Sequence, residues 1–80
     1  MEKLLRFILE NIVDHPEDIK IQTKESEYGY NLIEFEVNPE DMGRIIGKGG
    51  KIISSIRKII KIKAMKLGKR VNINLLEPEA

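Results

Sequence analysis

The sequence predicts an α+β fold, a two-layer sandwich with a three-stranded sheet and three helices on one face. Apolar residues recur at helical spacing in two segments and alternate with polar residues in three short segments. The elements follow the order helix, strand, strand, helix, loop, helix, strand (αββααβ). Three short strands that are apolar on one side can bury that side only against the apolar faces of the helices.

The first half of the chain predicts one helix and a β-hairpin. Residues 2–13 carry apolar side chains at three- and four-residue intervals, and charges interrupt the run too often for a signal peptide or a membrane span. Pro16 ends this helix. Residues 18–24 and 30–37 alternate as strands around a polar turn. The side chains expected to face inward are Ile19, Ile21, Thr23, Ile33, Phe35 and Val37.

The second half predicts two helices and a third strand. Residues 38–41, Asn-Pro-Glu-Asp, are typical of a helix start, and this short helix is expected to reach Ile46, which faces inward. A longer helix runs from Lys51 to the stop at Gly68, and residues 70–76 alternate as a strand. The residues expected on the apolar side of the long helix are Ile52, Ile53, Ile56, Ile60, Ala64 and Leu67. Lys63 also falls on this side, which conflicts with its charge.

Length and composition bound the domain organisation and the chemistry. We expect one domain over residues 1–76 and a frayed acidic tail at 77–80. The chain has no cysteine, which excludes disulfides and thiolate metal sites and fits the cytoplasm. His15 is the only histidine and has no clustered partner in the sequence, and the acids read as outward, solubilising charges. We therefore expect no enzyme, no cofactor and no metal.

Charge is strongly segregated although the net charge is only +1. Residues 1–41 hold 11 acidic and four basic residues, whereas residues 42–76 hold ten basic residues and no acid. This pattern is typical of an anion-binding region on an acidic body, as in nucleic-acid-binding proteins. The alternative is a solvated, lysine-rich helix face.

The loop Gly47-Lys48-Gly49-Gly50 joins two predicted helices. Its spacing and its lack of a preceding strand exclude a Walker loop and a dinucleotide fingerprint. A backbone without side chains beside the N-terminus of a helix lets a phosphate approach its amides, and Lys48 adds charge. The alternative is a tight turn whose glycines supply positive φ; one glycine would suffice for that, and here there are three.

The run IIGKGG at residues 45–50 resembles the I-I-G-x-x-G signature of KH domains, and the element order resembles their type II arrangement over nearly the whole chain. The resemblance implies binding of single-stranded RNA without catalysis, with the GxxG loop clamping about four nucleotides. It also implies a homodimer, or a heterodimer with another KH-containing protein. The RNA-binding residues expected by position are Gly47, Lys48, Gly49, Gly50, Arg44, Lys51, and Ile45 and Ile53 on the groove floor.

Two further expectations concern specificity and partners. No spaced pair of aromatics is available on a basic strand for stacking bases, so sequence preference should be slight, as suits an RNA chaperone or a post-transcriptional regulator. Ile59, Ile62 and Met65 fall off the apolar side of the long helix. They are either scattered exposed apolars or an interface for a partner. The competing hypothesis is a protein-interaction module that pairs through this helix.

Overall fold

The computed structural model describes residues 1–77 and confirms the predicted fold class and element order. Three 3₁₀ turns supplement the helices and strands. The elements are α1 (Glu2–Glu10), β1 (Lys20–Glu25), β2 (Tyr30–Glu36), α2 (Met42–Ile46), α3 (Lys51–Lys66) and β3 (Arg70–Leu75), with 3₁₀ turns at Pro16–Asp18, Pro39–Asp41 and Lys48–Gly50. Of the expected tail, Glu77 is exposed and residues 78–80 lie outside the described part. No helix within residues 1–77 has the length and apolar character to cross a bilayer.

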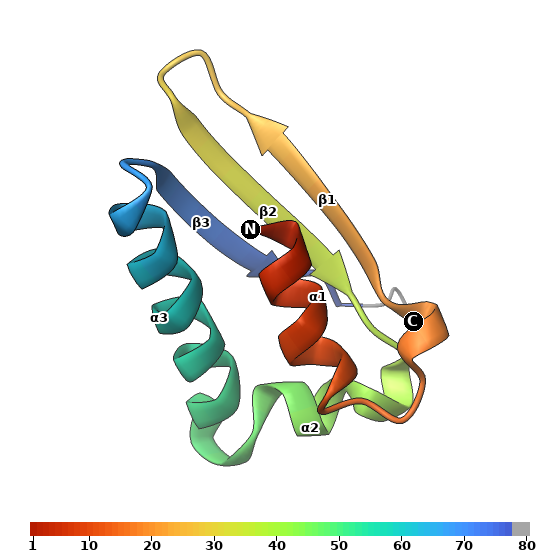
Figure 1. Ribbon diagram of the computed structural model, residues 1–80. Coiled ribbons are helices and arrows are strands. Elements are labelled where there is room, and N and C mark those ends of the chain that lie inside the picture. The colour runs from red at the N-terminus through yellow and green to blue at the C-terminus, as the bar shows by residue number, and fades with distance from the viewer. Residues whose placement is uncertain (78–80) are drawn as a thin grey trace.

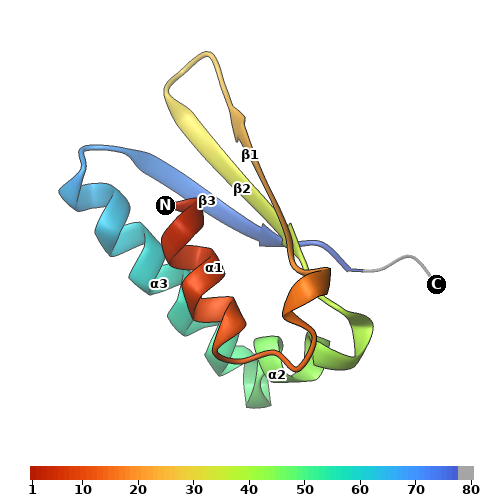
Figure 2. The same cartoon turned by 45° about the vertical axis from the view of Figure 1, so that its right-hand side comes forward.

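The sheet has the strand order β1-β2-β3, and the helices cover one of its faces (Figure 1, Figure 2). β1 pairs antiparallel with β2, whereas β2 pairs parallel with β3. A parallel pair requires a crossover connection, which α2 and α3 supply. The loop between these two helices therefore lies at one end of the sheet, and the outer edge of β3 has no neighbouring strand among the described residues.

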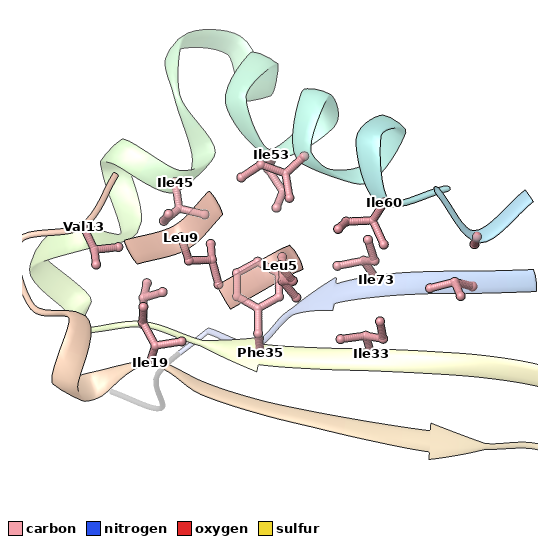
Figure 3. Close-up of a cluster of buried hydrophobic side chains, with 14 residues drawn as sticks. Leu5, Leu9, Val13, Ile19, Ile33, Phe35, Ile45, Ile53, Ile60 and Ile73 are labelled. Atoms are coloured by element: carbon pink, nitrogen blue, oxygen red, sulfur yellow. The ribbon is translucent and has the colours of Figure 1, made fainter. Parts of the chain in front are cut away.

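The core lies between the sheet and the helices (Figure 3). β2 contributes Ile33 and Phe35 to it, as the alternating pattern predicts, and the ring of Phe35 points toward α1. Each of the three α-helices and three strands supplies at least one side chain that belongs to this cluster or packs against it. The buried apolar residues are Leu5, Leu9, Val13, Ile19, Ile33, Phe35, Val37, Ile45, Ile53, Ile56, Ile60, Ala64, Val71 and Ile73.

Several expectations about which side chains point into the core were wrong. The buried stripe of α3 is narrower than predicted, because Ile52 and Leu67 are exposed and only Ile53, Ile56, Ile60 and Ala64 are buried. Lys63 is also exposed, which removes the conflict with its charge. Thr23 is exposed because β1 is an edge strand of the sheet.

The end of α3 forms as predicted. Gly68 has a φ of +70°, and its amide donates to the carbonyl of Met65. The amide of Lys69 donates to the carbonyl of Ala64 at 2.8 Å. These two bonds are the Schellman arrangement, which satisfies the last carbonyls of a helix and reverses the chain. The reversal brings β3 back under α3, alongside β2.

Candidate nucleic-acid interface

The turn between α2 and α3 requires glycine at position 47. Gly47 has φ 74° and ψ 172°, a combination that is essentially restricted to glycine. A Cβ at this position would lie 2.8 Å from Cβ of Ile52 and would collide with the rest of that side chain. The side chain of Ile52, predicted to be core, instead packs against the bare backbone of Gly47. This contact lets α3 start immediately after α2.

Gly49 and Gly50 also have positive φ, at 65° and 75°. All three loop glycines thus serve the turn, and the argument that three exceed its needs was wrong. What distinguishes Gly49 and Gly50 is their surroundings, because nothing lies within 4 Å of the point where a Cβ would sit. The backbone here is open to an approaching molecule.

Two adjacent amides in this loop are unengaged. The amide of Gly47 donates to Gly43 O and that of Gly50 to Gly47 O. For Lys48 and Gly49 the described chain provides no hydrogen-bond acceptor. The first turn of α3 likewise has no side-chain cap. Two neighbouring N–H donors without an internal partner, in the 3₁₀ turn that precedes α3, are a suitable site for an anion.

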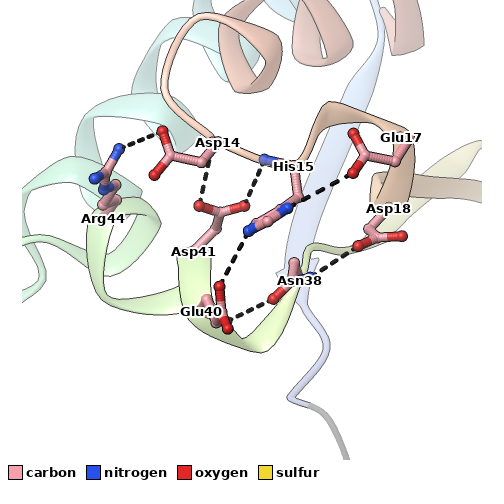
Figure 4. Close-up of polar contacts among 8 residues, drawn as sticks. All are labelled: Asp14, His15, Glu17, Asp18, Asn38, Glu40, Asp41 and Arg44. Carbon is pink, nitrogen blue, oxygen red and sulfur yellow. Dashed lines mark hydrogen bonds and ion pairs between the residues drawn. The ribbon is translucent and has the colours of Figure 1, made fainter.

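The side chains around the loop are mostly cationic. Lys48 and Lys51 are exposed and have no ion pair within residues 1–77. Arg44 differs, because its Nη1 donates to Oδ1 of Asp14 at 2.9 Å (Figure 4). An anion that uses Arg44 must compete with this carboxylate. Since both side chains are more than half exposed, water screens the pair and it is weak.

The apolar residues near the loop have a different arrangement from the one expected. Ile45 is fully buried and Ile53 is 8% exposed, so both lie in the core and support the loop from beneath. Ile46, expected to face inward, is half-buried. Adjacent residues on a helix point about 100° apart, so only one of Ile45 and Ile46 can enter the core. Of these three, Ile46 therefore presents the most apolar surface beside the loop.

A buried carboxylate holds α2 in place. Asp41, 1% exposed, accepts hydrogen bonds from the backbone amides of Asp14 at 3.0 Å and His15 at 3.1 Å (Figure 4). No sequence pattern indicated this contact, and the expectation that all the acids face outward was wrong for Asp41. The side chain of Asn38 caps the turn before α2 by accepting from the amide of Glu40, as predicted. Together these bonds fix the N-terminal end of α2 against the connection from α1 to β1.

His15 lies in the same network. Its Nε2 is 3.1 Å from Oε2 of Glu40, and its Nδ1 is 3.6 Å from Oε1 of Glu17. The hydrogen bond to Glu40 raises the pKa of His15 above its ordinary value, and the negative charges of Asp41, Glu40 and Glu17 raise it further. Partial burial of the imidazole lowers the pKa, but by less than the hydrogen bond raises it. Ligand atoms of His15, Glu17 and Asp18 lie within 4.8 Å of one another. Glu40 already engages His15 and Asn38 engages Asp18, so contacts within the chain account for the cluster.

Comparison with known proteins places the chain in a family. The profile described as "KhpA/KhpB, KH domain" matches residues 2–75. The chain belongs to the KhpA/KhpB family of KH domains. A KhpA/KhpB relative from Clostridium perfringens is 37% identical over 76 residues, which cover 95% of this chain and 100% of the relative. Another, from Listeria monocytogenes EGD-e, is 36% identical over 77 residues, covering 96% and 100%. Both are named "RNA-binding protein KhpA".

A solved structure supports the fold of this KhpA/KhpB family member. The crystal structure of an Era variant from Aquifex aeolicus, bound to GDP and AlF4⁻, superimposes with a TM-score of 0.61. The match is 23% identical and covers 91% of this chain and 28% of the Era chain. At this identity the likeness shows the fold alone.

Replacing Gly47 by alanine should destabilise the protein more than the same change at Gly49. Gly49 lies near the left-handed helical region, which costs an alanine about 1–2 kcal/mol, and the conformation of Gly47 is still less accessible to an alanine. Only at Gly47 does the new methyl also meet Ile52. We expect the free energy of unfolding, from urea titration, to fall by at least about 1 kcal/mol more for Gly47→Ala than for Gly49→Ala. Equal losses would show that the contact with Ile52 does not constrain the turn.

The His15 contacts predict a pH-dependent contribution to stability. A raised folded-state pKa means that the contribution is fully present below the unfolded pKa, about 6.5, and is lost as pH rises through the folded value. Glu40→Gln removes the main cause. We expect this variant to destabilise the protein more at pH 5.5 than at pH 8.5, and to lower the pKa of His15 measured by NMR. A pKa unchanged by Glu40→Gln would contradict the assignment.

Proposed function

We propose that the chain binds single-stranded RNA and that the loop Gly47–Gly50 holds the sugar-phosphate backbone. The observation that carries the proposal is the pair of unengaged amides at Lys48 and Gly49 in the 3₁₀ turn before α3, where the backbone at Gly49 has open space around it. Phosphate oxygens accept hydrogen bonds from such amides and are favoured by the positive end of the helix dipole. The relatives, named as RNA-binding proteins and not as enzymes, support this proposal and the expectation that the chain catalyses no reaction.

The residues around the loop have separate roles in this proposal. Lys48 and Lys51 attract the RNA through their charge, and that attraction weakens as salt increases. Arg44 contributes after it exchanges Asp14 for a phosphate. Ile45 and Ile53 fix the two helices from within the core, while Ile46 offers apolar surface to a base or ribose. Phosphate contacts carry the affinity.

Recognition through phosphates gives little sequence preference, because phosphate contacts carry no base information. Among the aromatics, Phe35 is buried, whereas Phe7 on α1, Tyr28 in the turn between β1 and β2, and Tyr30 at the start of β2 are exposed. They do not form the paired stacking surface of an RRM. We accordingly propose a general RNA-binding role in the cytoplasm, such as an RNA chaperone or a post-transcriptional regulator.

A protein partner is a second proposal, favoured by the outer face of α3. Ile59, Ile62 and Met65 are 47%, 67% and 76% exposed and lie off the buried stripe of α3. Three large apolar side chains at this spacing form a stripe that a second copy, or another KH-containing protein, could cover. The loop lies at the beginning of α3, so pairing through this stripe leaves the RNA site accessible.

Reversing the charge of the loop should abolish RNA binding. In the double variant Lys48→Asp, Gly49→Asp, carboxylates stand beside the amides that would hold phosphate. We expect the affinity for an unstructured oligoribonucleotide, measured by fluorescence anisotropy, to fall at least tenfold, about 1.4 kcal/mol. Lys20→Asp with Gln22→Asp makes the same charge change on the exposed side of β1 and is the control. Equal losses in the two double variants would leave only a net-charge effect and remove the loop from the proposal.

Introducing a charge into the α3 stripe should separate a dimer. Ile62→Glu places a carboxylate among apolar side chains, where burial is unfavourable. We expect sedimentation velocity to show a dimer for the unmodified protein and a monomer for this variant. Phe7→Glu, at a similarly exposed apolar position on α1, is the control and should remain a dimer. An unmodified protein that is a monomer, alone and with a KH-containing partner, would end the proposal.

A further inference from the structure

Of the three cations beside the loop, Arg44 alone has an acidic partner within residues 1–77. Its Nη1 donates to Oδ1 of Asp14 at 2.9 Å (Figure 4). Lys48 in the loop and Lys51 at the start of α3 are exposed and are in no ion pair there. Before any ligand binds, the loop thus presents two free lysines and one arginine whose charge is partly neutralised by a carboxylate.

The backbone that carries the Asp14 carboxylate is held on both sides. The amide of Asp14 donates to Oδ1 of the buried Asp41 at 3.0 Å, and the amide of His15 donates to Oδ2 at 3.1 Å. On the other side, Val13 is buried in the core, and its amide donates to the carbonyl of Leu9 at 3.0 Å. Asp14 therefore has little freedom to move away from α2.

The same buried carboxylate positions both members of the ion pair. Asp41 immediately precedes α2, and Arg44 lies in the first turn of that helix. Asp41 binds the backbone of Asp14, and the side chain of Asp14 in turn binds Arg44, which closes a ring of three residues (Figure 4). An exposed ion pair normally loses part of its Coulomb energy to the entropy of fixing two long side chains. Because aspartate is short and its backbone is already fixed here, this pair loses less.

A phosphate of RNA requires the guanidinium that Asp14 occupies. Carboxylates and phosphates accept the same N–H donors of arginine. The side chains of Arg44 and Asp14 are 56% and 61% exposed, so a phosphate can reach the pair and displace the carboxylate. A phosphate that used the other nitrogens of Arg44 would stand beside the Asp14 carboxylate and be repelled by it. In either arrangement Asp14 opposes binding.

We propose that Asp14 is an autoinhibitory residue, whose carboxylate occupies Arg44 in the free protein and lowers the affinity for RNA until a phosphate displaces it. The inference rests on the proposed function of the loop and adds a regulator of that site. Lys48, Lys51 and the loop amides bind RNA without this competition, and Arg44 joins them after the exchange. Asp14 thereby keeps the complex weaker and more readily reversible than the cations alone would make it.

Asp14→Asn tests the proposal, because autoinhibition and a purely structural role predict effects of opposite sign. Asparagine preserves the shape of the side chain and the backbone amide but removes the charge that neutralises Arg44. We expect the affinity for an unstructured oligoribonucleotide, measured by fluorescence anisotropy, to rise about two- to fivefold. A fall in affinity, or no change, would overturn the proposal. Thermal unfolding of the variant checks that it is folded.

Two controls separate the contact from an effect of net charge. Glu17→Gln removes one negative charge from the same connection between α1 and β1, at a carboxylate that contacts His15 and not Arg44, and should raise the affinity less. Asp14→Asn combined with Arg44→Gln should bind RNA no more tightly than Arg44→Gln alone, because the inhibition acts through the arginine. Equal gains from Asp14→Asn and Glu17→Gln, or the same gain with and without Arg44, would overturn the proposal.

A second measurement needs no substitution. The carboxyl ¹³C signal of the Asp14 side chain should move when RNA is added to the ¹³C-labelled protein, since the displaced carboxylate loses its arginine partner. The corresponding signal of Glu17 is the control and should move less. An Asp14 signal that stays in place at saturating RNA would show that Arg44 keeps its internal partner, which contradicts the exchange.

The two levels of the proposal fail differently. If loop charge reversal abolishes RNA binding, while Asp14→Asn raises the affinity no more than Glu17→Gln does, the autoinhibitory role of Asp14 is overturned and the loop proposal stands. If the unmodified protein does not bind the RNA, both are overturned.

Discussion

The close approach of Ile52 to Gly47 is the contact on which the candidate site depends. Because no side chain occupies position 47, α2 can turn directly into α3 at a backbone conformation that other residues do not adopt. The same turn leaves the amides of Lys48 and Gly49 without internal partners. Ile45 before the turn and Ile53 after it are both in the core, so the loop is held from both sides. The helices on either side of the loop are thus anchored in the core.

A second constraint is the crossover between the parallel strands β2 and β3. It obliges α2 and α3 to lie over one face of the sheet and places their junction at the sheet's end. Asp41 then fixes the start of α2 to the connection from α1 to β1. Acids therefore stabilise the body beside α2, while the segment from α2 to β3 carries none that would repel a polyanion.

Local patterns predicted most of the fold, because they depend on neighbours in the chain. Alternation placed Ile33 and Phe35 in the core, and Gly68 was correctly expected to end α3. What escaped prediction depends on residues distant in sequence. Asp41 contacts amides 26 and 27 residues away, and Arg44 pairs with Asp14 across 30 residues. Choosing between Ile45 and Ile46 required the orientation of a helix only five residues long.

The most direct test of the central claim is an amide NMR titration of the ¹⁵N-labelled protein with unstructured single-stranded RNA. If the loop backbone binds phosphate, the largest shifts will occur at the amides of Lys48 and Gly49, moving downfield as new hydrogen bonds form. If RNA binds while these two signals stay in place and the shifts gather elsewhere, for example on the uncovered face of the sheet, the account is contradicted.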